Sequence, residues 1–439
     1  MDAKQIASLL PALQAFLERF QFCFRREKTF GYLGKYVGGL MSDMDRKSIE
    51  PIALAMDVPV RTLQEFLAFF VWDHERLDDA MQRLIADEHA SSRPLGILDS
   101  SGHPKQGDKT PGVQRQYCGE RGKHENCVVG QHLLYTDGDR DNPFSCVLDS
   151  QLYVPQKWID DPDRCREAGI PAGMGFRAKW QIALDQVRRA IGNGIRMTYV
   201  VADADYGRIP AFWFGLDELG QRGVAFAPPD LACWTRRPAC CSSRSEHGSK
   251  RADHLAIHSP TFRDQPWTTV QVKTMTRGAS VWRYKVARVH LVAEKVQSRK
   301  GPSIPTDRRY WLIVADNRRT GERKYIVSND TAQADAVHLM RVALERWQVE
   351  KWFERAKQEC GLGAFEVRTY QSLLRHWLCC RLAMLFLARQ TKRLRGEKSE
   401  GDVRAGRSDC PYAATEAVEP LAAQLAGFET PMRLLPATQ

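Results

Sequence analysis

The sequence has no long uninterrupted hydrophobic run. Its most apolar stretch, 378–388, is short and is broken by Arg381, whereas a membrane-spanning helix needs about 20 apolar residues. The opening Met1-Asp-Ala-Lys-Gln is polar and carries both signs of charge, unlike a secretory signal peptide. We therefore expect a cytosolic protein with no membrane partner.

Ordered cysteine motifs are also missing. The 12 Cys are scattered without a repeated spacing, and no Cys-x-x-Cys occurs, which favours reduced thiols. Residues 233–258 do gather several Cys and His. No matching His pair accompanies them, so a zinc site there stays an open alternative to an ordinary polar segment.

Acidic residues are too few to balance the basic ones. The chain has 64 Lys and Arg against 53 Asp and Glu, a net charge of +11. This surplus suits a polyanion, nucleic acid first, although many basic proteins bind none. The 43% hydrophobic and 27% charged fractions are typical of a globular protein, and 439 residues suffice for two or three domains.

The segment Arg346–Lys357 predicts a helix, because it contains neither Gly nor Pro and is followed by Gly361. Arg346, Glu350 and Lys357 share one face of that helix, and a second face is apolar. An amphipathic helix with its charges in water is the plain interpretation. The alternative is that Glu350 holds a metal ion while Arg346 and Lys357 meet phosphate.

Two short apolar runs each end in an aspartate. Leu95–Asp99 and Met197–Asp203 both have the pattern of a buried strand that stops at an acid. Two such residues and a helix Glu are the hard oxygen ligands that two Mg²⁺ ions prefer, with Mn²⁺ as a substitute. Asp205 follows closely, and we favour Asp203 as the ligand because it lies nearer the strand end.

The motifs around the two aspartates resemble those of the DDE transposases of bacterial insertion sequences, which have a catalytic core similar to ribonuclease H. The first reads Leu-Asp99-Ser-Ser-Gly-His-Pro-Lys-Gln-Gly, followed by Gly112-Val-Gln-Arg-Gln-Tyr-Cys-Gly. The second reads Ala-Asp203-Ala-Asp-Tyr-Gly. The resemblance covers roughly residues 30 to 390.

The third motif of that family is a helix pattern of Tyr, two residues, Arg, three residues, Glu, six residues, Lys. Arg346, Glu350 and Lys357 match this spacing. Ala343 stands at the Tyr position, so the chain departs from the family there. We therefore do not expect the contact to the terminal phosphate that the resemblance implies for the Tyr.

The resemblance implies the roles of the candidate residues. It makes Asp99, Asp203 and Glu350 the catalytic metal ligands, and it places Arg346 and Lys357 on phosphate. Lys105 and Arg115 belong to a basic stretch, 103–126, that would follow a DNA backbone or else form a solvated loop.

The activity implied is that of a transposase that binds the inverted repeats at its element's ends, cleaves DNA and joins the 3′ ends to target DNA. Its partners would be double-stranded DNA at element ends and target, and a second copy of the chain on DNA, at the bacterial nucleoid. Two alternatives are a domesticated DNA-binding relative that no longer cuts and a metal-dependent nuclease that does not join.

The expected fold class is α/β: a ribonuclease H-like mixed sheet flanked by helices, with an N-terminal all-helical domain and a β-rich insertion in the core. We expect the chain to divide into a helical DNA-binding domain (1–90), two parts of the core (91–228 and 309–390), the insertion (229–308) and a C-terminal tail (391–439).

Two short helices in the N-terminal part predict a DNA reader. Ser48–Met56 and Val60–Phe70 are separated by Asp-Val-Pro, the outline of a helix-turn-helix. Arg61, Thr62 and Gln64 would lie where base edges are reached. An ordinary helical hairpin is the alternative.

Overall fold

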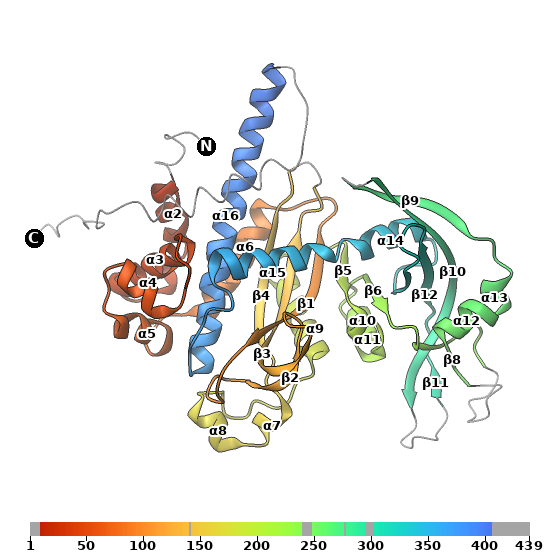
Figure 1. Ribbon diagram of the computed structural model, residues 1–439, viewed down its shortest axis with the longest axis horizontal. Helices are drawn as coiled ribbons and strands as arrows, with labels where there is room; N and C mark the ends of the chain where they lie inside the picture. The colour runs from red at the N-terminus through yellow and green to blue at the C-terminus, as the bar shows by residue number, and fades with distance from the viewer. Residues whose placement is uncertain (1–8, 140–141, 239–247, 276–277, 296–302, 406–439) are drawn as a thin grey trace, which may run out of the picture.

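The computed structural model describes residues 9–139, 142–238, 248–275, 278–295 and 303–405. Helices from the N-terminal part lie at one end, a central sheet follows, and a curved group of strands lies at the other end (Figure 1). The predicted tail beyond 405, and Cys240, Cys241 and His247 of the predicted polar segment, lie outside the described residues.

Residues 9–88 form helices and no strand. The helices are α2 (Leu9–Glu18), η1 (Gln21–Cys23), α3 (Glu27–Met41), α4 (Ile49–Ala55), α5 (Val60–Ala68) and α6 (His74–Glu88). Helix α5 has the expected amphipathic pattern and buries Leu63, Phe66 and Leu67.

The predicted helix, turn and second helix are present as α4 and α5. Asp57 takes a left-handed backbone conformation, with φ of 49°, which Asp tolerates better than most residues. Arg61 and Gln64 are exposed on α5, and Thr62 is half-buried. Two of the three side chains predicted to face base edges are therefore exposed.

The central sheet is mixed, as predicted. Its strands are β1 (Leu95–Pro104), β2 (Gln114–Cys118), β3 (Lys123–Thr136), β4 (Ser145–Leu152), β5 (Tyr199–Ala202) and β6 (Gly223–Ala227). Strand β1 pairs antiparallel with β3, which also pairs with β2 and β4, and on its other side β1 pairs parallel with β5, which pairs parallel with β6.

Helices connect and flank these strands: α7 (Gln156–Ile159), α8 (Pro162–Glu167), α9 (Lys179–Gly192), α10 (Ala204–Gly207) and α11 (Pro210–Glu218). A parallel pair needs a crossover connection, and α9 lies between β4 and β5 in the chain. The arrangement of a mixed sheet flanked by helices confirms the predicted fold class and is consistent with a ribonuclease H-like core.

The expectation that the first strand ends at Asp99 is wrong. Strand β1 continues to Pro104 because β3 keeps pairing with it, from Asp99 opposite His132 to Pro104 opposite Cys127. Periodicity could not reveal this, since the polar residues after Asp99 are accommodated by a neighbouring strand that is distant in sequence. Asp99 therefore lies within a strand and not at its end.

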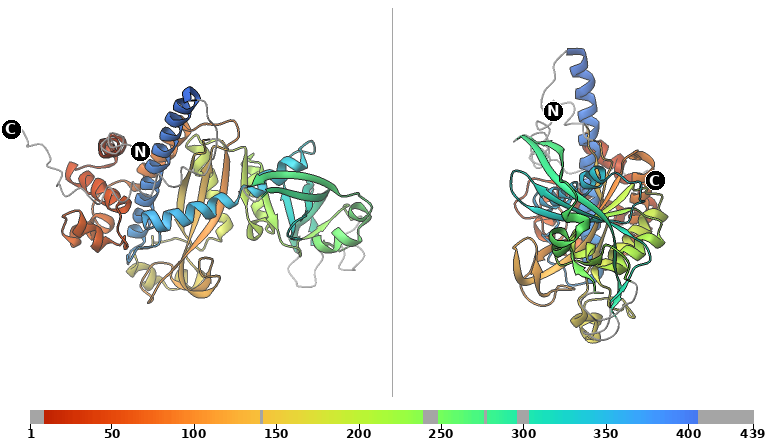
Figure 2. Two further views of the ribbon diagram at one scale, coloured as in Figure 1. Left: turned by 45° about the horizontal axis from the view of Figure 1, so that its top comes forward. Right: turned by 90° about the vertical axis from the view of Figure 1, so that its right-hand side faces the viewer.

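Strands after β6 extend the same sheet. They are β7 (Ala232–Trp234), β8 (Lys250–Arg251), β9 (Thr268–Met275), β10 (Gly278–Lys295), β11 (Ser303–Pro305), β12 (Tyr310–Asn317) and β13 (Arg323–Ser328), with the short helices α12 (Ala252–His258) and α13 (Pro260–Arg263). Strand β13 pairs with β6 and with β12, and β12 pairs with β10. The two views of Figure 2 show this second group curving away from the central strands.

Three helices close the chain: α14 (Ala336–Leu344), α15 (Trp347–Cys360) and α16 (Tyr370–Ala405). The predicted helix over Arg346–Lys357 is present as α15, although Arg346 itself directly precedes its first residue, and α14 ends separately at Leu344. Gly361 then ends α15 in a left-handed conformation, φ 62°, as the sequence predicted. No helix in the described part of the chain is long and apolar enough to cross a bilayer.

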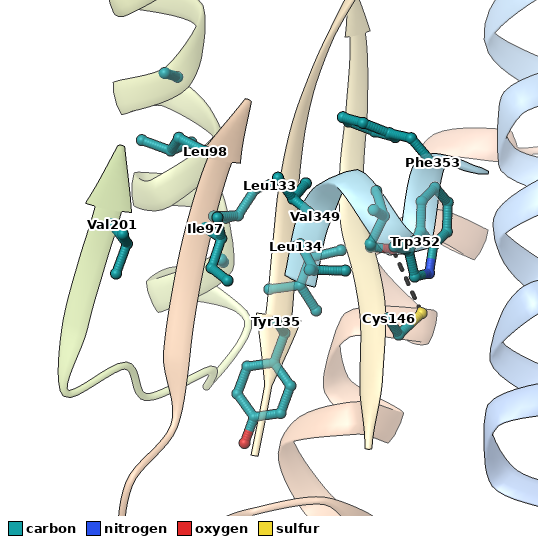
Figure 3. Packing of buried hydrophobic residues seen from close by; sticks show 14 of the residues in the cluster. Ile97, Leu98, Leu133, Leu134, Tyr135, Cys146, Val201, Val349, Trp352 and Phe353 are labelled. Atoms are coloured by element: carbon teal, nitrogen blue, oxygen red, sulfur yellow. Dashed lines mark hydrogen bonds between the residues drawn. The ribbon is translucent and has the colours of Figure 1, made fainter. Parts of the chain in front are cut away.

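The apolar face of α15 packs on the central strands. Val349, Trp352 and Phe353 are buried and point from α15 toward strand residues such as Leu133 and Leu134 (Figure 3). Burying a side chain of this size contributes roughly 1.5–3 kcal/mol. This contact fixes which side of α15 faces away from the sheet, and hence where its charged residues lie.

Candidate active site

Asp99 lies in β1, and Asp203 directly follows β5, the parallel neighbour of β1. The parallel pairing of β1 and β5 places Ile97 beside Val201, and both aspartates come two residues later. Side chains two residues apart share a face of the sheet, and paired strands run about 4.8 Å apart. The two carboxylates therefore project from the same face of adjacent chain segments.

Asp203 is held by the turn that follows β5. It precedes α10, and its Oδ1 accepts hydrogen bonds from the backbone N–H groups of Asp205 at 2.9 Å and Tyr206 at 3.4 Å. At Gly207 an added Cβ would lie 1.8 Å from the Phe226 carbonyl oxygen, so only Gly allows this close approach. Asp205 is exposed, and Asp203 is the acid that the motif fixes beside β1.

Arg346 links the first and third acids of the predicted triad. Its Nη1 lies 2.7 Å from Asp99 Oδ2, and its Nη2 is hydrogen-bonded to Glu350. The Asp99 side chain is 14% exposed, whereas that of Glu350 is 60% exposed. The structure thus brings Asp99, Asp203, Arg346 and Glu350 to one place, with the guanidinium between the sheet and α15.

Burial disfavours the charged forms of the Asp99 and Asp203 carboxyl groups. Burial raises the pKa of Asp99 to about 6; the Arg346 guanidinium opposes this rise, and the negative charges of Asp203 and Glu350 reinforce it. Burial also raises the pKa of Asp203, with the charge of Asp205 adding to it. Clustered, partly buried carboxylates of this kind are common at functional sites.

The donor set of this site fits a hard divalent cation. Asp99, Asp203 and Glu350 offer only carboxylate oxygens, which Mg²⁺ and Mn²⁺ prefer. In the described residues, no three His, Cys, Asp or Glu side chains are gathered closely enough to hold a metal ion. Arg346 instead bridges Asp99 and Glu350, so a cation held by all three acids requires that this guanidinium move away.

Lys357 reaches the edge of the same sheet. Its Nζ donates to the Gly102 carbonyl oxygen at 3.2 Å and to Glu120 Oε2 at 2.7 Å. Glu120 lies in the turn between β2 and β3, and the sequence analysis did not single it out. No local signal could have done so, because the contact joins residues far apart in the chain.

The side chain of Lys105 forms its hydrogen bonds with backbone carbonyl groups and not with the three candidate acids. Its Nζ donates to the carbonyl oxygens of Gly363 at 2.9 Å and Phe365 at 2.6 Å, and it lies 3.6 Å from the centre of the Phe365 ring. Burial lowers the pKa of Lys105 to about 8. This side chain fastens the loop after α15 to β1. Arg115, by contrast, is exposed on β2.

The position that departs from the helix pattern has a packing role. Ala343 is buried in α14, at 1% exposure. Its small side chain contacts the core and offers no polar group.

The predicted polar segment shows no metal centre in the part that the structure describes. Cys233 is buried in β7, while His254 and His258 lie on α12 with ring centres 4.5 Å apart.

Comparisons with known proteins identify sequence relatives of this chain. A family model described as "DDE superfamily endonuclease" matches residues 19–289, more than half of the chain, including Asp99 and Asp203 but ending before Glu350. A "Probable transposase for insertion sequence element IS701" from Microchaete diplosiphon is 28% identical over 183 residues, which are 41% of this chain and 44% of that protein. The match therefore spans less than half of the relative's length.

Proposed function

The chain belongs to the DDE superfamily of endonucleases, and from that premise we propose that it is the transposase of a bacterial insertion sequence. It would bind the inverted repeats at the ends of its element, cleave phosphodiester bonds there and join the freed 3′ ends to target DNA. The protein of Microchaete diplosiphon, named as a probable transposase, supports this choice within the superfamily.

One observation carries the proposal. Asp99 lies in β1, Asp203 directly follows the parallel strand β5, and Arg346 connects Asp99 to Glu350 on α15. In the two-metal mechanism, two ions on either side of one reacting phosphate are held by the protein's ligands. Here β1, the turn after β5 and α15 each supply one acid.

Each residue has a distinct role in the proposed reaction. Asp99, Asp203 and Glu350 would hold two Mg²⁺ ions, or Mn²⁺ in their place. Such ions would lower the pKa of the attacking water and stabilise the leaving 3′ oxygen. Arg346 would turn from the acids to the non-bridging phosphate oxygens, which its planar fork fits. Lys357, beside it, would add a point charge.

We place end recognition on the N-terminal helices. Arg61 and Gln64 project from α5 into solvent, on the second helix of the helix-turn-helix outline, which enters the major groove in proteins of that class. Arg115 on β2 would contact a phosphate of the same DNA. Two element ends are brought together in transposition, so we expect a dimer on DNA, acting at the nucleoid.

The test uses the purified full-length protein and a plasmid that carries the gene with both flanking segments. With Mg²⁺ the wild type should nick and then join this DNA. Asp99→Asn, Asp203→Asn and Glu350→Gln should each lower the cleavage rate by a factor of about 1,000 or more, while DNA binding in a gel-shift assay stays within roughly twofold. Asp205→Asn is the matched control, and it should retain cleavage.

The outcomes separate the candidate activities. Cleavage without joining would identify a nuclease, and binding without cleavage by the wild type would identify a DNA-binding protein that has lost its chemistry. Full activity of any of the three triad variants would remove that residue from the site.

A further inference from the structure

Gln131 uses both ends of its side-chain amide beneath the candidate active site. It lies on β3 and is fully buried. Its Nε2 donates to the backbone carbonyl oxygen of Asp99 at 3.1 Å, and its Oε1 accepts a hydrogen bond from the hydroxyl of Tyr206. One side chain therefore contacts the backbone of the first acid and the segment that carries the second.

Tyr206 completes the connection to the second acid. It lies three residues after Asp203 in α10 and is 4% exposed. Its backbone N–H donates to Asp203 Oδ1 at 3.4 Å, while its hydroxyl extends to Gln131. A continuous chain of hydrogen bonds thus runs from the backbone of Asp99 through Gln131 and Tyr206 to the carboxylate of Asp203.

A third element holds this chain in place. Gln186 of α9 donates from Nε2 to the backbone carbonyl oxygen of Gln131 at 2.9 Å. Gln186 is 1% exposed. Hydrogen bonds between groups so deeply buried are stronger than the same bonds in water, and breaking one leaves its partner unsatisfied. The spacing of the two acid-bearing segments is therefore set by side-chain contacts as well as by the short β1–β5 pairing.

We propose that Gln131 and Tyr206 are positioning residues that set the separation of the Asp99 and Asp203 carboxylates and thereby tune their affinity for divalent cations. The proposal rests on the function proposed above. Neither side chain needs to touch the substrate or the ion. Their effect passes through Asp99 and Asp203, as is usual for groups that orient metal ligands.

The chemistry of the pair explains why other side chains would not serve. Gln presents a donor to the Asp99 carbonyl and an acceptor to the Tyr206 hydroxyl at once, whereas an ionised Glu could only accept. Tyr206→Phe removes one hydroxyl and leaves Gln131 Oε1 without its donor. Gln131→Asn keeps the amide but shortens its reach, so it cannot contact both partners.

The test measures Mn²⁺ binding to the full-length protein without DNA, by isothermal titration calorimetry, together with the melting temperature. Tyr206→Phe and Gln131→Asn should each weaken Mn²⁺ binding by roughly tenfold or more. The matched control is Tyr310→Phe. Tyr310 is 1% exposed, and its hydroxyl bonds a carboxylate, Asp217 Oδ2, at 3.0 Å, outside the acid cluster. It should lower the melting temperature by a similar amount while Mn²⁺ affinity stays at the wild-type value.

Three results would overturn the inference. Suppose that Asp99→Asn loses Mn²⁺ binding but that Tyr206→Phe and Gln131→Asn both bind Mn²⁺ as tightly as the wild type. The positioning role would then be refuted, while the proposed cation site would stand. An equal loss of affinity in Tyr310→Phe would show a general effect of stability. If Asp99→Asn binds Mn²⁺ as the wild type does, the proposed cation site itself fails, and the positioning role fails with it.

Discussion

A single buried histidine ties the N-terminal helices to the last helix. The hydroxyl of Tyr36 on α3 lies 2.8 Å from Nδ1 of His376 on α16, and Nε2 of His376 lies 3.1 Å from the Gly361 carbonyl oxygen. A carbonyl can only accept, so Nε2 donates to Gly361. Burial lowers the pKa of His376 to about 4, so the ring is neutral near pH 7 and Nδ1 then accepts from the Tyr36 hydroxyl.

The lowered pKa of His376 predicts that the protein loses stability in acid. The folded-state pKa of His376 is below the unfolded value of about 6.5, so the unfolded chain binds more protons between these two values, and the free energy of unfolding falls as pH drops through that window. This group alone should lower the unfolding free energy by about 2 kcal/mol between pH 7.5 and pH 5.

Urea denaturation at both pH values checks this expectation. His376→Gln should be less stable at pH 7.5 but should lose less on going to pH 5, whereas His124→Gln, at an exposed position on β3, should behave as the wild type. An unchanged pH dependence in His376→Gln would contradict the argument.

At the scale of elements, sequence patterns were enough to predict the helices α4, α5 and α15, the start of β1 and the strand β5. Local sequence patterns failed where the structure depends on residues that are distant in sequence. Strand β1 runs past Asp99 because β3 pairs with it. The hydrogen bonds of Lys105 to the carbonyls of Gly363 and Phe365 also join distant parts of the chain. Long-range contacts of this kind cannot be predicted from a short segment of sequence.

The same limit applies to the candidate site. The spacing of Arg346 and Glu350 in a helix is a local property, and it was predictable. That the guanidinium also reaches Asp99 depends on the packing of α15 on the sheet. Gln131 and Tyr206 meet across two strands and a turn, so neither could be singled out before the fold was known.

The C-terminal end of α10 should tolerate no side chain at Gly207. An added Cβ would lie 1.8 Å from the Phe226 carbonyl oxygen, so Gly207→Ala must displace backbone on β6 or α10. We expect it to destabilise the protein by more than about 2 kcal/mol and to abolish DNA cleavage through the displacement of Asp203.

Gly192→Ala is the matched control for that variant. Gly192 ends α9 and has no atom within 4 Å of an added Cβ, so Ala there should be neutral or stabilising by up to about 1 kcal/mol. Thermal unfolding of both variants decides the matter, and equal melting temperatures would refute the steric argument.

Over the whole molecule, one sheet joins the central strands to those that follow β6. Strand β13 lies between β6 and β12, and β12 pairs with β10. Residues that sequence composition assigned to an insertion are thus hydrogen-bonded, through neighbouring strands, to the strands that hold the acids. The chain also carries a net charge of +11 over its full length.

The surplus of positive charge predicts DNA binding that weakens steeply with salt. Each phosphate contact releases counterions, so the dissociation constant should rise by at least about tenfold between 50 and 200 mM KCl. Fluorescence anisotropy with a labelled duplex from the gene's flank measures this. Asp99→Asn should show the same slope as the wild type, since it lies outside the phosphate contacts. A flat response would mean that charge does not drive the association.

The bridge that Arg346 forms between Asp99 and Glu350 has a consequence for the order of assembly. A guanidinium that turns to a DNA phosphate removes its positive charge from both carboxylates at once. DNA binding would therefore increase the affinity of the acids for cations. By thermodynamic reciprocity, bound cations would increase the affinity of the protein for DNA by the same factor. On the proposed function, the acids would therefore take up divalent cations mainly after DNA had drawn Arg346 away from them.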